Sequence, residues 1–215
     1  MTLLDMVNQV LVRLRENQAT STTVGVLPPL ISALVQDAYK IVEDSHDWSV
    51  LRETINVPTV IGQTDYELTD VPVDSNIFDV YYQNNRVLKR YSKEWVAQRK
   101  LYAGNDQNEP TGYYVKGANP TTGNLIIEVY PTPDAIYQLD VSVAKRGTVP
   151  TSDNDVLVIP TDPVLHMALA FATRERGETG GTSAQEYFGL ADISLRSAIA
   201  RDAAHRPDEL ILYTP

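Results

Sequence analysis

Cysteine is absent from the 215 residues of this chain, which excludes disulfide bonds, thiolate metal sites and cysteine nucleophiles. Its absence also fits folding in a reducing cytoplasm. Long apolar runs are missing as well. The longest strongly apolar stretch, residues 164–172, is far too short to cross a bilayer, and residues 1–5 lack the basic start of a signal peptide. We therefore expect a soluble protein without membrane segments.

Positive charge is scarce in this chain. It has 18 Lys and Arg against 28 Asp and Glu, which gives a net charge of −10. Because nucleic-acid affinity requires clustered Lys and Arg, the composition disfavours a general nucleic-acid binder. An acidic wall would suit a protein past which DNA slides without adhering, although solubility alone also explains the excess of acid.

Patterns typical of catalysis or metal binding are also missing. His46, His166 and His205 are scattered, and none has a second His at the helical spacing of a metal site. Asp153 to Asp155 lack the glycine and the terminal glutamate of a calcium loop and indicate a turn. The glycine-rich residues 177–183 lack a phosphate-binding lysine, and no G-x-S-x-G turn occurs. We predict no catalytic residue, no metal and no cofactor, and hence a protein that is not an enzyme.

The hydrophobic period changes from 3.6 residues to two and back again along the chain. This change predicts an α+β fold in which a four-helix body, two helices from residues 1–49 and two from 160–206, carries an inserted module. The module, at 50–159, is expected to be an antiparallel β-sandwich or barrel-like structure. Residues 207–215 are expected to form an extended C-terminal tail. Such an insertion builds docking surface more readily than an active site.

Local signals support these elements. Pro28 and Pro29 suit the first turn of the second helix, and Asp162 followed by Pro163 marks the start of the third. Inside the β module, residues 91–102 break the alternation and predict a short helix.

A β-hairpin and a helix start are predicted next to each other inside the module. Residues 77–82 and 86–90 flank three polar residues, which is typical of a hairpin. Ser92 is the expected start of the short helix that follows.

Tyrosine is concentrated in the module. Nine of the 12 tyrosines lie between Tyr66 and Tyr137, whereas the chain has only three Phe. Tyrosine offers a large contact area with a hydroxyl that tolerates water, which suits interfaces. Packing on half-exposed strands would explain the tyrosines equally well.

A basic run interrupts the acidic chain, with Glu94 the only acid among six bases, Arg86, Lys89, Arg90, Lys93, Arg99 and Lys100. A solvated face is the default interpretation, and pairing with the acidic helical arms of another subunit is the sharper hypothesis. The residues that we predict to contact another subunit or a tail protein are Arg86, Lys89, Arg90, Lys93, Trp95, Tyr113 and Tyr114.

The C-terminal segment is too apolar for a disordered terminus without a role and too short to fold alone; its apolar residues are Leu210, Ile211, Leu212 and Tyr213. They could fold back on their own domain or add to a partner as an extended strand. We favour the partner.

A succession of short motifs runs along nearly the whole chain: the helix at 3–14, Asp47-Trp48, Gly62 to Leu68, Ile77 to Tyr82, Trp95, Pro110 to Tyr114, Leu125 to Pro133 and Ile159-Pro160. Each motif alone is unspecific. Their order resembles that of the head-to-tail adaptor proteins of tailed bacteriophages, the family that includes tail tubular protein A.

The resemblance implies a structural virion protein, made in the host cytoplasm, that forms a homo-oligomeric ring of about twelve subunits under the portal vertex. The helical arms would surround a DNA channel, and the β modules would face the next tail component, a nozzle or its equivalent. The C-terminal segment would reach the portal protein. DNA would pass without sequence-specific recognition, and no membrane would be involved.

Two other functions stay open. A carbohydrate- or protein-binding β module on a helical stalk predicts that Trp95 or the tyrosine cluster is exposed for stacking. An acid–base enzyme predicts two buried acids in one cleft with shifted pKa values.

Overall fold

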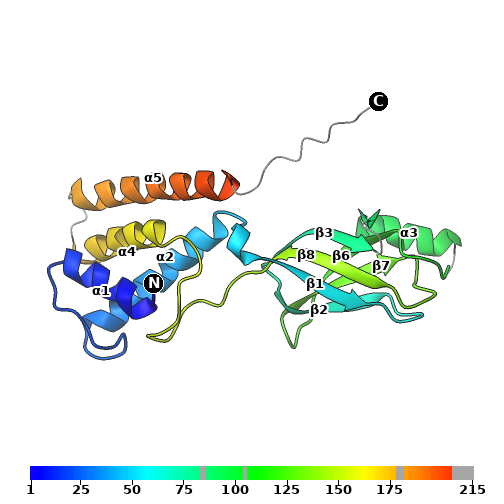
Figure 1. Cartoon of the computed structure of the whole chain (residues 1–215), viewed down its shortest axis with the longest axis horizontal. Helices are drawn as coiled ribbons and strands as arrows, with labels where there is room; N and C mark the ends of the chain where they lie inside the picture. The colour runs from blue at the N-terminus through cyan, green and yellow to red at the C-terminus, as the bar shows by residue number, and fades with distance from the viewer. Residues whose placement is uncertain (83–85, 104–105, 178–181, 205–215) are drawn as a thin grey trace. The chain divides into compact units, whose positions relative to one another are not determined.

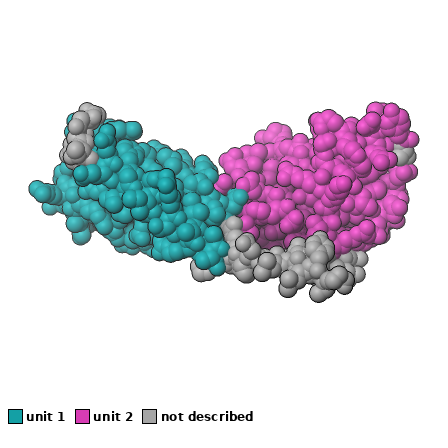
Figure 2. Space-filling model, turned by 90° about the horizontal axis from the view of Figure 1, so that it is seen from above, with its two compact units in different colours: residues 1–50, 147–215 teal, residues 51–146 magenta. Residues whose placement is uncertain are grey.

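The chain forms two compact units (Figure 2). Unit 1 comprises Met1–Val50 and Gly147–Pro215, and unit 2 comprises Leu51–Arg146. The sequence analysis placed the return to the helical body at residue 160, whereas unit 1 resumes at Gly147. The computed structural model describes residues 1–82, 86–103, 106–177 and 182–204.

Unit 1 is a helical bundle in which one helix contacts three others (Figure 1). α4 packs against α1, α2 and α5, and each helix buries an apolar stripe as its period of 3.6 predicts. Each fully buried Val, Leu, Ile or Met side chain contributes roughly 1.5–3 kcal/mol. The bounds are α1 (Leu3–Arg13), α2 (Leu27–Asp44), α4 (Thr161–Glu175) and α5 (Thr182–Ala204).

α5 packs on α4 through small side chains. Ala184, Ala191 and Ala198 are buried and lie seven residues apart, so they share one face of the helix. Leu190 and Ile193 point away from that face and are exposed. α5 therefore presents an uncovered apolar strip within unit 1.

The acidic stretch before α4 forms the expected turn and holds the start of α1. Asp155 accepts hydrogen bonds from the backbone N–H groups of residues 151 and 152, both at 2.8 Å, which lowers the pKa of its carboxyl group. The Leu3 N–H donates to the Asp155 carbonyl at 2.9 Å, and the Leu4 N–H donates to the Asp153 carbonyl at 3.2 Å. Residues 147–160 are thereby tied to unit 1.

Unit 2 consists of two separate four-stranded sheets that are not closed into a barrel. Buried side chains from both sheets form one cluster, so the expected α+β class is confirmed with a sandwich arrangement. All pairs are antiparallel except β5 and β6, which are parallel. In one sheet the strand order is β1 (Arg52–Pro58), β8 (Gln138–Ala144), β3 (Asn76–Tyr82) and β4 (Arg86–Val87). In the other sheet the strand order is β2 (Asp65–Pro72), β7 (Asn124–Tyr130), β6 (Gly112–Ala118) and β5 (Lys89–Arg90).

The chain changes sheets at Leu88. β4 pairs with β3, which confirms the predicted hairpin at Arg86 and Val87, but the second strand does not run on to Arg90, because Lys89 and Arg90 pair with β6 instead. The hairpin loop at 83–85 lies outside the described residues. Leu88 is buried and its N–H donates to the Val80 carbonyl at 2.8 Å. β5 then joins the other sheet, and α3 (Lys93–Ala103) follows. The Ser92 hydroxyl accepts the Trp95 N–H at 3.2 Å, so Ser92 starts this helix as predicted.

Candidate functional site

The predicted contact residues lie on β4, β5, α3 and β6 of unit 2. Arg90 on β5 pairs in register with Tyr113 on β6, and α3 packs against β6. Trp95 on α3 lies against a small buried cluster formed by Val96, Tyr114 and Tyr130. The fold thus brings Arg90 beside Tyr113 and Trp95 against Tyr114, pairs that lie 23 and 19 positions apart in the sequence.

The cations of this surface are exposed and mostly unpaired. The Arg86 guanidinium lies 3.2 Å from the Glu109 carboxylate. By contrast, four other exposed cations have no carboxylate partner among the residues that the structure describes; they are Lys89, Arg90, Lys93 and Arg99. Exposed cations of this kind contribute little to stability and are available to a partner. We call these four residues with Arg86 the basic surface.

Beneath the basic surface, two aromatic rings are stacked. The rings of Tyr91 and Trp95 lie 3.9 Å apart at 11°, and Tyr130 meets Trp95 edge-on at 5.7 Å. The Arg99 guanidinium lies 5.2 Å from the Trp95 ring centre, within cation–π range. A Cβ on Gly112 would lie 2.1 Å from Tyr91, so only glycine permits this close approach.

Tyr113 and Tyr114 lie inside the unit. Tyr113 is 2% exposed and belongs to the core between the sheets, where burial raises the pKa of its hydroxyl. Tyr114 is 6% exposed and donates its hydroxyl to Glu128 at 2.5 Å. Neither ring is therefore exposed for a direct contact, whereas Arg86, Lys89, Arg90 and Lys93 are exposed.

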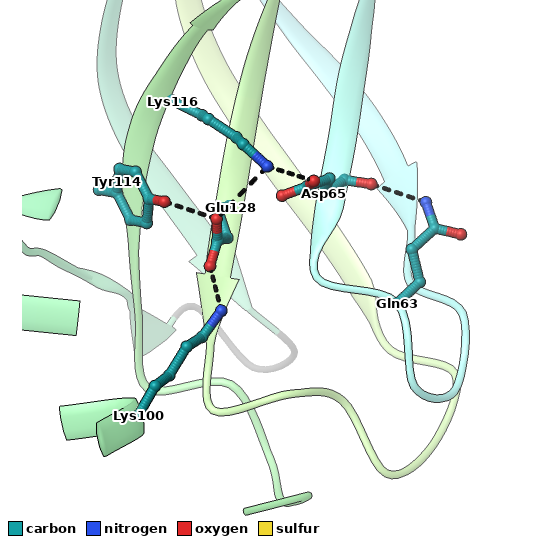
Figure 3. Close-up of polar contacts among 6 residues, drawn as sticks. All are labelled: Gln63, Asp65, Lys100, Tyr114, Lys116 and Glu128. Atoms are coloured by element: carbon teal, nitrogen blue, oxygen red, sulfur yellow. Dashed lines mark hydrogen bonds and ion pairs between the residues drawn. The ribbon is translucent and has the colours of Figure 1, made fainter. Parts of the chain in front are cut away.

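Glu128 is the centre of a polar network that the sequence analysis missed (Figure 3). Its side chain is 6% exposed, and it accepts hydrogen bonds from Lys100 on α3 and Tyr114 on β6. Lys116 lies 3.8 Å from the same carboxylate and 2.5 Å from Asp65 on β2. Lys100, which sequence analysis placed on a solvated face, therefore ties α3 to the sheet. A signal existed, because Glu128 is the lone acid in the apolar strand β7.

The electrostatics of this network keep the carboxylate ionised. Burial raises the pKa of Glu128, but hydrogen bonds from Lys100 and Tyr114 and the charges of Lys100 and Lys116 outweigh it and hold the pKa below its usual value. Burial and the hydrogen bond to Glu128 raise the pKa of Tyr114. A general acid needs a raised carboxyl pKa, so this arrangement has the features of a structural network.

The alternative of a carbohydrate- or protein-binding module requires aromatic rings that are exposed for stacking, and the structure shows both buried and exposed rings. Trp95 is partly buried by its ring contacts, and Tyr113, Tyr114 and Tyr130 are buried. At the end of α3, however, Tyr102 is 82% exposed, next to Leu101 at 85%. These two side chains add apolar area to α3 and suit contact with a protein.

Two features are absent from the described residues. No helix among them is both long and apolar enough to cross a membrane. In the same ranges, no three His, Cys, Asp or Glu side chains are grouped so that they could bind a metal ion. The predicted portal-contact residues 210–213 lie outside the described residues.

Comparison with known proteins identifies the family. Curated proteins gave no match to this chain. A family model described as SU10 adaptor protein matches residues 1–210, which is nearly the full length. This is a phage adaptor family of structural proteins, in agreement with the adaptor resemblance of the motifs, whereas the likeness to tail tubular protein A in particular has no support from it. The chain belongs to the SU10 adaptor protein family.

Proposed function

We propose that the protein is a head-to-tail adaptor of the virion neck, which forms a ring of about twelve copies beneath the portal protein. The ring docks the next tail component and forms part of the channel through which DNA passes without sequence-specific recognition. The observation that carries this proposal is the match to an adaptor family over residues 1–210.

The helical unit supports the ring. α2 exposes Leu30 and Ile41 on a face separate from its buried stripe, and α5 exposes Leu190 and Ile193. α2 and α5 each pack on α4, which leaves one uncovered apolar strip on each. Two different strips on one subunit suit a heterologous contact, in which α5 of one copy packs on α2 of the next and the contacts close into a ring.

The charge distribution supports a DNA channel. The sequence of unit 1 carries eight Lys and Arg and 16 Asp and Glu, a net charge of −8. Because a surface with this excess of acid repels phosphates, DNA would slide along it without adhering. A need for solubility alone would not require the excess of acidic residues to be concentrated in one unit.

The two predicted contact regions complete the proposal. The apolar residues 210–213 would dock on the portal protein. The basic surface would contact either the neighbouring subunit or the next tail component, because all of its cations except Arg86 lack carboxylate partners among the described residues.

A co-sedimentation experiment with the portal ring of the same phage tests the proposal. We expect the wild-type chain to sediment with the portal as one complex. The triple variant Lys89→Glu, Arg90→Glu, Lys93→Glu should lose either ring formation or capture of the next tail component, whereas Lys89→Arg with Lys93→Arg retains both. A chain that never sediments with the portal would refute the adaptor function. Retention of both activities by the triple variant would refute the contact role of the basic surface.

A further inference from the structure

A groove of about 430 Å³ lies between α2 and α4 of unit 1, and we call it the α2–α4 groove. Its apolar side chains are those of Leu34 and Ile41 on α2 and Phe171 on α4. Ile41 is exposed, whereas Leu34 and Phe171 are half-buried. The Phe171 ring also meets Phe188 of α5 edge-on at 5.9 Å, which holds it in place. Among the described residues, those that line the groove come from α2 and α4 alone, so the α5 helix of the same copy leaves it open.

Charged side chains rim the α2–α4 groove. The Lys40 ammonium lies 4.0 Å from the Asp37 carboxylate of the same helix. The Arg174 guanidinium lies 5.5 Å from the centre of the Phe171 ring, so it stands close to the apolar floor of the groove. Arg174 and the neighbouring Glu175 have no ion-pair partner among the residues that the structure describes. A partner that fills this groove therefore needs apolar side chains and a carboxylate within reach of Arg174.

α5 carries this set of side chains on its exposed face. Leu190 and Ile193 are exposed, and the exposed Glu186 precedes Leu190 by about one helical turn, so the three side chains share a face. We call these three residues the α5 strip. Glu186 has no cation partner within the described part of the chain, whereas Asp192 pairs with Arg196 at 2.9 Å. The strip thus offers two apolar side chains and one unpaired carboxylate.

We propose that the α2–α4 groove of one copy receives the α5 strip of the next copy. Leu190 and Ile193 pack on the apolar floor of the groove, and Glu186 pairs with Arg174. The strip residues stand at positions i, i+4 and i+7, the spacing with which an amphipathic helix anchors in an apolar groove. This inference rests on the ring of the proposed function, and it names the receiving site and the ion pair that fixes the register of the contact.

Charge complementarity favours a second copy as the occupant. The unpaired cation at the groove matches the unpaired carboxylate of the strip, and both belong to the same chain. Each copy offers one groove and one strip on different helices, so the contact is heterologous and repeats from copy to copy until the ring closes. Two α5 strips packed on each other would instead end at a dimer and leave Arg174 of both copies unpaired.

Cross-linking between two full-length variants tests this contact. Since the chain has no cysteine, Ile41→Cys in one copy and Ile193→Cys in another introduce single thiols at exposed positions. A short bismaleimide should link an equimolar mixture into mixed dimers and leave each variant alone monomeric. In the control mixture Val12→Cys, an exposed apolar position on α1, replaces Ile41→Cys, and no mixed dimers should form. Dimers from Ile193→Cys alone would show that α5 packs on α5 and would overturn the groove contact.

A charge exchange tests the ion pair in the same cross-linking assay. Arg174→Glu is placed in the copy with the groove thiol, and Glu186→Arg in the copy with the α5 thiol. Either change alone should lower the yield of mixed dimers roughly three- to ten-fold, because it brings like charges together. Both changes together should restore the yield, since the pair is then reversed. Arg13→Glu on α1 is the matched control and should leave the yield unchanged; equal yields for all combinations would overturn the pairing of Glu186 with Arg174.

Measurements with and without the portal ring separate the groove contact from the proposed function. The mixtures are cross-linked as concentrated protein alone and again after addition of the portal ring. Binding to the portal without mixed dimers in either condition overturns the groove contact and leaves the adaptor function intact. Mixed dimers without portal binding support the groove contact and overturn the proposed portal docking. Absence of both mixed dimers and portal binding overturns both.

Discussion

Replacement of Glu128 by glutamine should destabilise unit 2 strongly for a single isosteric change. The wild-type carboxylate is contacted by Lys100, Tyr114 and Lys116 and is almost fully buried. Breaking a buried ion pair costs about 3–5 kcal/mol. Lys100 and Lys116 are each partly exposed, and water screens their charges, while glutamine still accepts one hydrogen bond. We therefore expect a loss of ~2–3 kcal/mol in the free energy of unfolding of unit 2.

Urea unfolding followed by tryptophan fluorescence measures this loss. Trp95 lies in unit 2 and Trp48 in unit 1, so a Trp48→Phe background leaves Trp95 as the only tryptophan. With a slope of about 1–3 kcal/mol per molar urea, the midpoint should fall by roughly 1–2 M. Glu53→Gln, at an exposed position of β1, is the matched control and should stay within about 0.5 kcal/mol of the reference. Equal midpoints for the two variants would refute the role of the network.

The difference in stability between the wild type and Glu128→Gln should depend on pH. The pKa of Glu128 is lowered by folding, so its contribution to stability is present above its ordinary value of 4.5 and is lost as pH falls through the folded value. The stability difference between wild type and Glu128→Gln should accordingly be full at pH 7 and shrink below about pH 4.5. A difference that grows on acidification would contradict the assigned sign.

Three further predictions concern other parts of the chain. Gly112→Ala should displace Tyr91 and cost about 2–3 kcal/mol in unit 2, whereas Gly189→Ala, in an open helical position, should stabilise α5 by up to about 1 kcal/mol; urea midpoints of the two variants decide this. Thr2→Ala removes the capping box of α1 and should lower the stability of unit 1 by about 1 kcal/mol in thermal unfolding followed by circular dichroism. Deletion of residues 208–215 should weaken assembly with the portal and leave the unfolding temperature nearly unchanged, and a large fall would place the segment within the fold.

The fold follows from local signals more completely than the site does. Helical period, the proline-containing start of α2 and the Ser92 start of α3 are local properties, and each of them appears in the structure. The alternation of β8 likewise places Leu139, Val141 and Val143 in the core. Period-two alternation does not distinguish a barrel from two separate sheets, because both bury every second residue.

The Glu128 network and the hydrogen bond between Asp202 and Ser49 depend on tertiary proximity, which no local sequence pattern encodes. Glu128 meets a lysine from α3 and another from β6, and no spacing rule joins those three elements. Tyr113 and Tyr114 suggested a surface because tyrosine tolerates water, yet sheet packing places both rings inside. Asp202 and Ser49 are 153 positions apart, so their hydrogen bond leaves no local trace.

The mass of the portal complex tests the adaptor function most directly. Mass photometry of the portal ring alone and after mixing with this 23.9 kDa chain should show an increase of about 290 kDa, as about twelve added copies require. An unchanged mass at saturating protein would contradict the account.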